Sequence, residues 1–412
     1  MTRDQQLPKG LLSSAGWVDL VQAGADVRSG SVGLPLLVAS DAAIDANVAV
    51  MARFCAAAGV ELAPHAKTSM CREITRRQLA HGAWGMTAAT VEQVAVLHSF
   101  GVPVILMANL VVDERAVRWL ADHVLGDPAT RFLCYVDSLA SVALLDRVLS
   151  GSGARLDVLL EVGFSGGRTG VRDAATALEV ADAVCRTSTL RLCGVSCFEG
   201  LAPGFSDGTV PGAVGDLLRR AREVVVSLHE RNRFAPGEPP IVTAGGSSFF
   251  DVVVEELGPD RFPFPVRTVL RSGCYVTHDH GIYQRTSPLD GRAVGGLRLT
   301  AALEVLAAVL SRPEPDLVIV GCGRRDVPSD AGLPVPLGVL DPPARRLGSR
   351  PAESFAINDH HLFVRVDPTS ELAVGDVLRL GISHPCGAFD RWRQIPLVDA
   401  DHRLVGVLEP QF

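Results

Sequence analysis

The repeating unit of this chain is visible in residues 103–136, PVILMANLVVDERAVRWLADHVLGDPATRFLCYV. This segment contains an apolar run at 103–108, an amphipathic helical pattern over 113–124, and a second apolar run at 131–136. Short apolar runs separated by one helix are typical of parallel β-α-β units. The same alternation continues on both sides, so it is the basis for predicting the architecture.

Eight such apolar runs occur between residues 36 and 275. They lie near residues 60–66, 83–88, 103–108, 131–136, 156–162, 191–197, 240–244 and 266–271. Helical patterns fill most of the gaps, and another, over 41–58, precedes the first run. Eight β-α units in about 240 residues have the size and rhythm of a (β/α)8 TIM-type barrel. A doubly wound open sheet is the alternative, because counting strands does not exclude it.

The pattern changes after residue 275. Helical periodicity disappears, short apolar runs recur between turns, and Pro and Gly punctuate residues 327–352. The chain is therefore predicted to be an α/β protein with a second, mostly β C-terminal domain. The barrel is assigned to residues 36–275 and the β domain to 276–412, while residues 1–35 are expected to pack on the β domain.

Composition excludes several classes of protein. The 412 residues are 47% hydrophobic and 21% charged, with a net charge of −7, which indicates a folded chain with a large core. The sequence contains no basic stripe of the kind that binds nucleic acids. It also contains no run of about 18 apolar residues, so no membrane-spanning helix is predicted. The first residues lack the apolar core of a signal peptide, and the nine cysteines are scattered. We therefore expect a cytoplasmic protein with reduced thiols.

Lysine is nearly absent from this sequence. Of 39 basic residues, only Lys9 and Lys67 are lysines. Arginine cannot replace a lysine that must lose its proton and attack a carbonyl group. Lys9 lies in a polar N-terminal tail, whereas Lys67 follows the first apolar run, where barrel residues face the active site. This position indicates a chemical role for Lys67.

A loop rich in glycine and serine, Gly245-Gly246-Ser247-Ser248, follows the seventh apolar run. Its bare backbone N–H groups and hydroxyls could bind a phosphate, and phosphate sites in barrels often follow strands seven and eight. The alternative is a tight turn in which Ser247 caps a helix. A reactive lysine and a phosphate loop in one barrel predict a pyridoxal 5'-phosphate cofactor on Lys67.

Six segments in collinear order resemble the motifs of the D-threonine aldolase and eukaryotic-type D-serine dehydratase family, which are fold-type III pyridoxal-phosphate enzymes related to alanine racemase. The most similar branch is the bacterial one often labelled amino acid deaminase. One departure is Phe198, where many members have Tyr. The segments are residues 64–70, 161–170, 194–200, 243–247, 271–275 and 383–386.

The resemblance implies a role for each matching residue. Lys67 holds the cofactor and acts on the Cα proton of the substrate. Arg168 lies near the phenolic oxygen of the cofactor or the substrate carboxylate, and Arg271 lies near the pyridine nitrogen. The other residues expected to contact the cofactor are Phe198, Gly245, Gly246, Ser247, Gly273, Cys274 and Tyr275, with Gly246, Ser247, Gly273 and Cys274 at the phosphate.

A short metal motif lies near the C-terminus, at His384 and Cys386. On a strand, residues two apart share a face, so both side chains could bind one ion. The resemblance implies that they do, with water and substrate in the remaining positions. The family's aldolases carry a carboxylate at the second position, whereas thiolate suits Zn²⁺. Cys386 therefore favours zinc and a dehydratase. The alternative is that Cys386 is a buried structural cysteine and His384 a surface histidine.

Two other polar clusters, at residues 278–280 and 358–361, are interpreted as structural.

The resemblance further implies a homodimeric lyase. It would convert a β-hydroxy D-amino acid of the D-serine or D-threonine type to a 2-keto acid and ammonia, with Lys67, His384 and Cys386 as catalytic residues. Alternatives are an aldolase that breaks Cα–Cβ, an amino acid racemase, and a pyridoxal-phosphate-binding protein without turnover. A racemase needs a second base, for which Tyr283 is a poor candidate, and the C-terminal domain argues against a non-catalytic binder.

Overall fold

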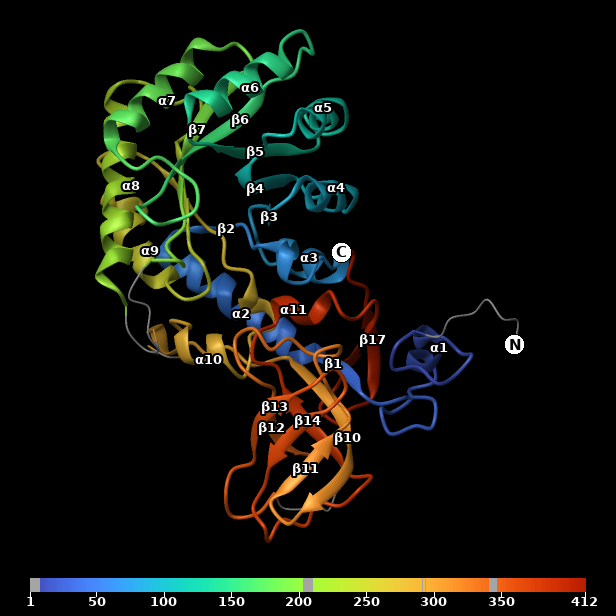
Figure 1. Cartoon of the computed structure of the whole chain (residues 1–412). Coiled ribbons are helices and arrows are strands. Elements are labelled where there is room, and N and C mark those ends of the chain that lie inside the picture. Colours follow the sequence, from blue (N-terminus) through green and yellow to red (C-terminus); the bar gives the residue numbers. More distant parts are fainter. Residues whose placement is uncertain (1–7, 203–209, 291, 293, 341–346) are drawn as a thin grey trace.

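The structure is a computed structural model that describes residues 8–202, 210–290, 292, 294–340 and 347–412. It contains a barrel of parallel strands covered by helices and a mostly β domain below it (Figure 1). This arrangement confirms the predicted α/β architecture with a second β domain.

Eight parallel strands form one sheet in the order β2-β9-β8-β7-β6-β5-β4-β3. Backbone hydrogen bonds of 2.8 Å, from Trp84 N to Leu62 O and from Thr87 N to Pro64 O, join its two ends. The sheet therefore curls into the predicted barrel. The strands are β2 (Glu61–Leu62), β3 (Met86–Ala88), β4 (Val104–Leu110), β5 (Arg131–Val136), β6 (Leu156–Val162), β7 (Leu190–Cys197), β8 (Ile241–Ala244) and β9 (Arg267–Leu270).

Helices cover the outside of this sheet. Several begin at a side chain that accepts a hydrogen bond from the first turn, such as Ser40, Thr90, Asp113, Ser138 and Asp173. Each buries an apolar stripe at helical spacing against the strands. The helices are α2 (Asp41–Ala58), α3 (Arg72–Ala80), α4 (Val91–Ser99), α5 (Glu114–His123), α6 (Leu139–Leu149), α7 (Ala174–Arg186), α8 (Gly212–Glu230) and α9 (Phe250–Leu257).

The β domain is a second sheet whose main path is β13-β14-β11-β10-β1-β16-β17, with β15 pairing both β10 and β12. Its strand β1 (Leu36–Ser40) comes from the segment that the sequence pattern groups with the barrel. So short an apolar run carries no information about its pairing partners, and here they are β10 and β16. The other strands are β10 (Leu303–Glu314), β11 (Leu317–Val320), β12 (Val335–Val339), β13 (Glu353–Ile357), β14 (Leu362–Arg365), β15 (Val377–Gly381), β16 (Ile395–Val398) and β17 (Leu404–Leu408).

The N-terminal segment packs against the last hairpin of the β domain. Leu404 N donates to Ala25 O at 2.8 Å, and Val27 N donates to His402 O at 3.2 Å. The remaining short elements are α1 (Trp17–Gln22), α10 (Ile282–Thr286), α11 (Cys386–Phe389), η1 (Ala66–Thr68), η2 (Pro259–Arg261), η3 (Cys274–Val276) and η4 (Val294–Gly296).

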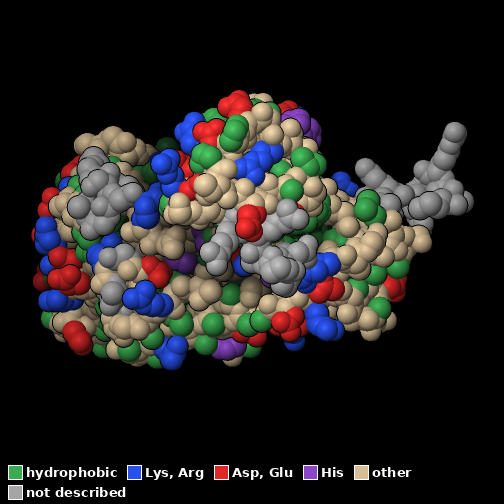
Figure 2. Space-filling view, turned by 90° about the horizontal axis from the view of Figure 1, so that it is seen from below, with side chains coloured by type: hydrophobic (Ala, Val, Ile, Leu, Met, Phe, Trp, Pro, Cys, Tyr) green, Lys and Arg blue, Asp and Glu red, His purple; other side chains and the backbone are tan. Residues whose placement is uncertain are grey.

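The surface is mixed in charge. On the face shown in Figure 2, acidic and basic side chains are interspersed and do not gather into separate fields. Within the ranges given above, no helix is both long and apolar enough to span a bilayer. All nine cysteines are free thiols, as their scattered positions predict.

Candidate active site

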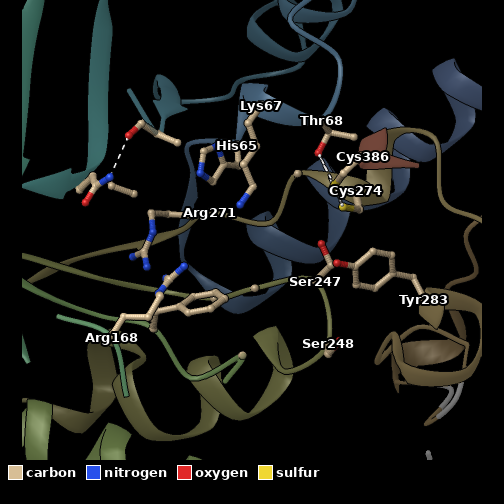
Figure 3. A pocket seen from close by; sticks show the side chains of 18 of the residues that line it. His65, Lys67, Thr68, Arg168, Ser247, Ser248, Arg271, Cys274, Tyr283 and Cys386 are labelled. Carbon is tan, nitrogen blue, oxygen red and sulfur yellow. Dashed lines mark hydrogen bonds between the residues drawn. The ribbon is translucent and has the colours of Figure 1, made fainter. Parts of the chain in front are cut away.

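A cavity of about 570 Å³ lies where the carboxyl ends of the barrel strands meet the β domain. Its walls come from both domains, and Figure 3 shows Lys67 and Arg271 pointing into it, with Cys274 and Cys386 on one side. Every residue that the sequence places in the site lines this cavity except Tyr275. These residues are Lys67, Arg168, Phe198, Gly245, Gly246, Ser247, Arg271, Gly273, Cys274, His384 and Cys386.

The structure corrects the position of Tyr275. Its hydroxyl accepts a hydrogen bond from Gln78 Nε2 at 2.9 Å, and the ring packs among α2 and α3 outside the cavity. Burial raises the pKa of this hydroxyl. Cys274 and Tyr275 are consecutive in the 3₁₀ turn η3, where neighbouring side chains point in different directions, so only Cys274 reaches the site.

Lys67 lies in η1, directly after β2, and its side chain is exposed to the cavity. His65 lines the cavity two residues earlier. Burial and the positive charges of Lys67 and Arg271 hold the pKa of His65 well below its usual value. A neutral imidazole therefore lies beside the lysine, and it does not compete with Lys67 for negative charge in the site.

The other lysine has a structural role. Lys9 Nζ is 2.6 Å from Asp326 Oδ1, donates to Arg325 O at 2.9 Å, and lies over the Trp392 ring. These contacts fasten the N-terminal segment to the β domain. Lys9 therefore lies outside the cavity that Lys67 lines.

Arg271 forms the inner end of the cavity, within the barrel. Its guanidinium donates to Thr243 Oγ1 and to Cys197 O, both at 2.7 Å, and the side chain is buried. Nearby, burial raises the pKa of the Glu161 carboxyl group, while Thr169 and Arg271 act in the opposite direction. Arg271 is thus a fixed cation, held in place by the ends of β7 and β8.

Arg168 reaches the cavity from the loop after β6. Its guanidinium lies over the Phe198 ring, 4.7 Å from the ring centroid. Phe198 follows β7, so this contact joins the loops after two neighbouring strands. The phenylalanine that departs from the family pattern therefore serves as a platform that orients Arg168.

Glu199 is a site residue whose role the sequence did not reveal. Its side chain is fully buried and accepts hydrogen bonds from Gly245 N at 3.1 Å and from Gly246 N at 2.6 Å. The sequence pattern predicts that these two backbone N–H groups are available to bind a phosphate. The carboxylate holds the loop in shape, so a phosphate here would depend on the neighbouring serine hydroxyls and on the turn at Gly273.

Replacing Glu199 with glutamine is expected to lower the free energy of unfolding by about 1–3 kcal/mol and to weaken cofactor binding. A glutamine amide cannot accept from both backbone N–H groups, so one is left buried without a partner. Urea denaturation and cofactor titration would measure the two effects. Glu255→Gln, an exposed position on the following helix, is the matched control. Equal stability and cofactor affinity in both variants would contradict this role.

Three potential metal ligands converge at the other side of the cavity. The ligand atoms of Cys274, His384 and Cys386 all lie within 4.8 Å of one another, and the two sulfur atoms are 3.3 Å apart. Thr68 Oγ1 is 3.6 Å from each sulfur. The sequence had assigned Cys274 to the phosphate through its backbone; the structure adds its thiol to the predicted pair.

The charges in this cluster are strongly coupled. Hydrogen bonds from Cys386, His384, Tyr283 and Thr68 hold the pKa of Cys274 well below its usual value despite burial. The Cys274 thiolate in turn raises the pKa of Cys386 and, together with Asp330, raises the pKa of His384 to about 9. Asp330 Oδ2 lies 2.7 Å from His384 Nδ1, which leaves Nε2 free to bind an ion.

The local structure of this motif differs from the prediction. Strand β15 ends at Gly381, and Cys386 is the first residue of the short helix α11. The intervening Pro385 lacks a backbone N–H and has helical dihedral angles, so it cannot continue a strand ladder. The two side chains therefore meet through a turn and not through the alternation of a strand.

The other polar clusters do not form comparable sites. In the described part of the chain, Cys274, His384 and Cys386 are the single group of three side chains with metal-ligand spacing. Asn358 N donates to His361 O at 2.8 Å, so residues 358–361 form the exposed turn between β13 and β14. Asp279 Oδ1 accepts from three backbone N–H groups at the start of α10.

The residues present fit pyridoxal phosphate. Two buried polar atoms of cavity-lining residues, His65 Nδ1 and Glu161 Oε2, have no hydrogen-bond partner among the described residues. A Cβ on Gly246 would lie 3.2 Å from the Phe198 ring, and one on Gly273 would lie 2.4 Å from His65 O. A side chain at either position would crowd these neighbours, so both loops line the cavity as bare backbone. The sulfur and nitrogen donors likewise fit a soft divalent ion such as Zn²⁺.

Two family models match the chain. The alanine racemase N-terminal domain matches residues 40–249, just over half of the sequence, and a putative serine dehydratase domain matches residues 302–398. A D-threonine aldolase from Arthrobacter sp. is 29% identical over 359 residues, covering 86% of each chain. A D-threo-3-hydroxyaspartate dehydratase from Delftia sp. (strain HT23) is 28% identical over 291 residues, covering 69% of this chain and 70% of the relative.

A solved structure is similar over nearly its whole length. The crystal structure of D-threonine aldolase from Filomicrobium marinum has a TM-score of 0.75 at 25% identity, covering 92% of this chain and 95% of that one. Together with the cavity, Lys67 and the metal-ligand cluster, these matches show that the chain belongs to the alanine racemase-like, fold-type III family of pyridoxal-phosphate enzymes, among the D-threonine aldolase and D-serine dehydratase-like members.

Proposed function

We propose that this protein is a pyridoxal-phosphate- and metal-dependent ammonia-lyase. It would remove water from a β-hydroxy D-amino acid of the D-serine or D-threonine type, and hydrolysis of the released enamine by one water molecule would give a 2-keto acid and ammonia. The named relatives support the broader part of this proposal, because both are lyases of β-hydroxy D-amino acids. The choice between elimination and aldol cleavage depends on the metal-ligand cluster.

The observation that carries the proposal is the pair of sulfur atoms at that cluster. Elimination requires the β-hydroxyl to depart, so its oxygen must be bound by a Lewis acid. Aldol cleavage requires the same hydroxyl to lose its proton, which calls for a base. Cys274 and Cys386 are sulfur ligands and not carboxylates, and the Asp330 carboxylate is already bonded to His384. The donor set therefore favours elimination.

Each residue of the site would have a distinct role in this reaction. Bound pyridoxal phosphate would supply an electron sink for the pair left when the Cα proton departs. Lys67 would take that proton, because it is the amine that lines the cavity. Arg168, whose guanidinium lies over the Phe198 ring, would orient the carboxylate of the substrate. Arg271 would provide a fixed positive charge at the inner end of the cavity. An ion on the three metal ligands would supply the Lewis acid.

A second candidate is a D-threonine-type aldolase, which the 29% identity over 86% of the chain favours. A racemase is supported less well. Tyr283 does line the cavity, but the Cys274 thiolate and burial raise the pKa of its hydroxyl well above the usual value, so it is a poor base. The homodimer expected from the resemblance stays a prediction, which size-exclusion chromatography with light scattering would check.

Product analysis with D-threonine tests the proposal directly. The metal-loaded holoenzyme is expected to give 2-oxobutanoate and ammonia as main products, with L-threonine as the stereochemical control. Cys386→Asp places a carboxylate at the ion, so elimination is expected to fall and some glycine to appear. Glycine and acetaldehyde as the main wild-type products would replace the dehydratase with the aldolase, and D-threonine converted to L-threonine would indicate the racemase.

A further inference from the structure

We propose that Cys274 is a third protein ligand of the metal ion, and that the resulting site selects substrates whose only polar β-substituent is a hydroxyl group. The ligand set stands on the geometry alone, whereas the substrate preference rests on the proposed function. The inference goes beyond the predicted pair of His384 and Cys386, because a third ligand changes both the charge of the ion and the number of positions that remain open.

The position of the Cys274 thiol supports direct ligation. It is buried in η3 at the end of β9, it lies 3.3 Å from the Cys386 sulfur, and its donor atom is within 4.8 Å of the other two. Cys274 comes from a barrel loop, whereas His384 and Cys386 come from the β-domain segment that runs from the end of β15 to the first residue of α11. An ion bound there would therefore cross-link the two domains of the chain.

The ligand types determine which ion fits. Two thiolates and one imidazole form a soft donor set, which suits Zn²⁺ and Co²⁺ and does not suit Mg²⁺ or Mn²⁺. Three protein ligands of a tetrahedral ion leave one position open, the arrangement found in catalytic zinc sites. Two thiolates also neutralise a divalent ion, so the bound ion would carry little net charge with which to attract an anion.

The surroundings of the cluster disfavour a second carboxylate on the substrate. The Asp330 carboxylate is bonded to His384, and Thr68 and Tyr283 add neutral groups. Among the described residues that line the cavity, the arginine and lysine side chains are Lys67, Arg168 and Arg271. Arg271 is fixed deep in the barrel and Lys67 is needed for the chemistry, so Arg168 remains for a single carboxylate.

The substrate preference follows from these two features. A lone β-hydroxyl is neutral and needs one open position. A 3-hydroxyaspartate would bring its β-carboxylate to an ion with little net charge and would compete for a second position to chelate. We therefore expect D-threonine and D-serine to bind better than D-threo-3-hydroxyaspartate, in contrast to what the name of the Delftia relative states for that protein.

Cobalt substitution tests the ligand set without relying on turnover. The Co²⁺-loaded holoenzyme is expected to show sulfur-to-cobalt charge transfer, and Cys274→Ser should lose about half of it, since two thiolates contribute. The zinc affinity of Cys274→Ser should fall by more than about 100-fold, because loss of a ligand exceeds the effect of losing an outer contact. Cys185→Ser, an exposed cysteine on α7, is the matched control. If Cys274→Ser does not fold, Cys274→Ala gives the same readout.

Titrating amino acids into the Co²⁺ protein tests the preference and separates it from the proposed function. D-Threonine is expected to perturb the cobalt spectrum at lower concentration than D-threo-3-hydroxyaspartate. In Cys274→Ser the concentrations needed for the two amino acids should become more similar, because loss of the thiolate opens a second coordination position on the ion. Full charge transfer in Cys274→Ser would overturn the third ligand, and tighter binding of hydroxyaspartate would overturn the preference. Tight D-threonine binding with no keto acid formed would support this inference and refute the dehydratase.

Discussion

Replacing Lys67 with arginine is expected to abolish the covalent attachment of pyridoxal phosphate and to lower the turnover rate by more than about 10³-fold. Arginine keeps the positive charge but cannot lose its proton, so it neither attacks the cofactor carbonyl nor takes the Cα proton. Lys67 lies directly after β2 and lines the cavity, and no second lysine is near it. Absorbance of the holoenzyme and steady-state rates would measure both losses.

Lys9→Arg is the matched control for this experiment, because it makes the same substitution at the other lysine of the chain. Its contacts with Asp326 and Trp392 should survive with a guanidinium group, so activity should stay near the wild-type rate. Borohydride reduction followed by peptide mapping should place the pyridoxyl group on Lys67. A label on Lys9, or a fully active Lys67→Arg variant, would refute the assignment of the cofactor lysine.

Removing the metal is expected to eliminate turnover while the visible absorbance of the cofactor remains. The ion would act on the leaving β-oxygen, whereas the cofactor would be attached to Lys67, which Figure 3 shows apart from Cys274 and Cys386. If the ion contributes about 4 kcal/mol to the transition state, its loss lowers the rate by about 10³-fold. Activity and absorbance of the chelated enzyme, with metal content measured in parallel, would check this.

His384→Gln should reproduce the effect of chelation without a chelator, since it removes the nitrogen ligand and the contact with Asp330. His360→Gln, in the exposed turn between β13 and β14, is the control and should keep both metal and activity. Addition of Zn²⁺ should restore the chelated wild-type enzyme. Undiminished turnover with an empty metal site would contradict the role of the ion and, with it, the proposed route of elimination.

The order of the elements was readable in the sequence because it depends on local periodicity. The unit at residues 103–136 appears in the structure as β4, α5 and β5, with boundaries shifted by one or two residues. The apolar run at 36–39 is a case in which the local sequence does not predict which strands pair with each other. Residues Leu36–Ser40 form β1, but its partners β10 and β16 lie more than 250 residues away in the chain and cannot be inferred from so short an apolar segment.

The residue types and the chain order of the site were also set in the sequence: a lone lysine after the first barrel strand, glycines and serines after the seventh, and His384 with Cys386 near the C-terminus. The folded structure alone showed that the Cys274 thiol lies within 4.8 Å of the ligand atoms of His384 and Cys386, that Tyr275 turns away from the cavity, and that Glu199 accepts hydrogen bonds from Gly245 N and Gly246 N. The physical reason is that periodicity fixes which residues follow each strand, whereas their contacts depend on how separate loops converge.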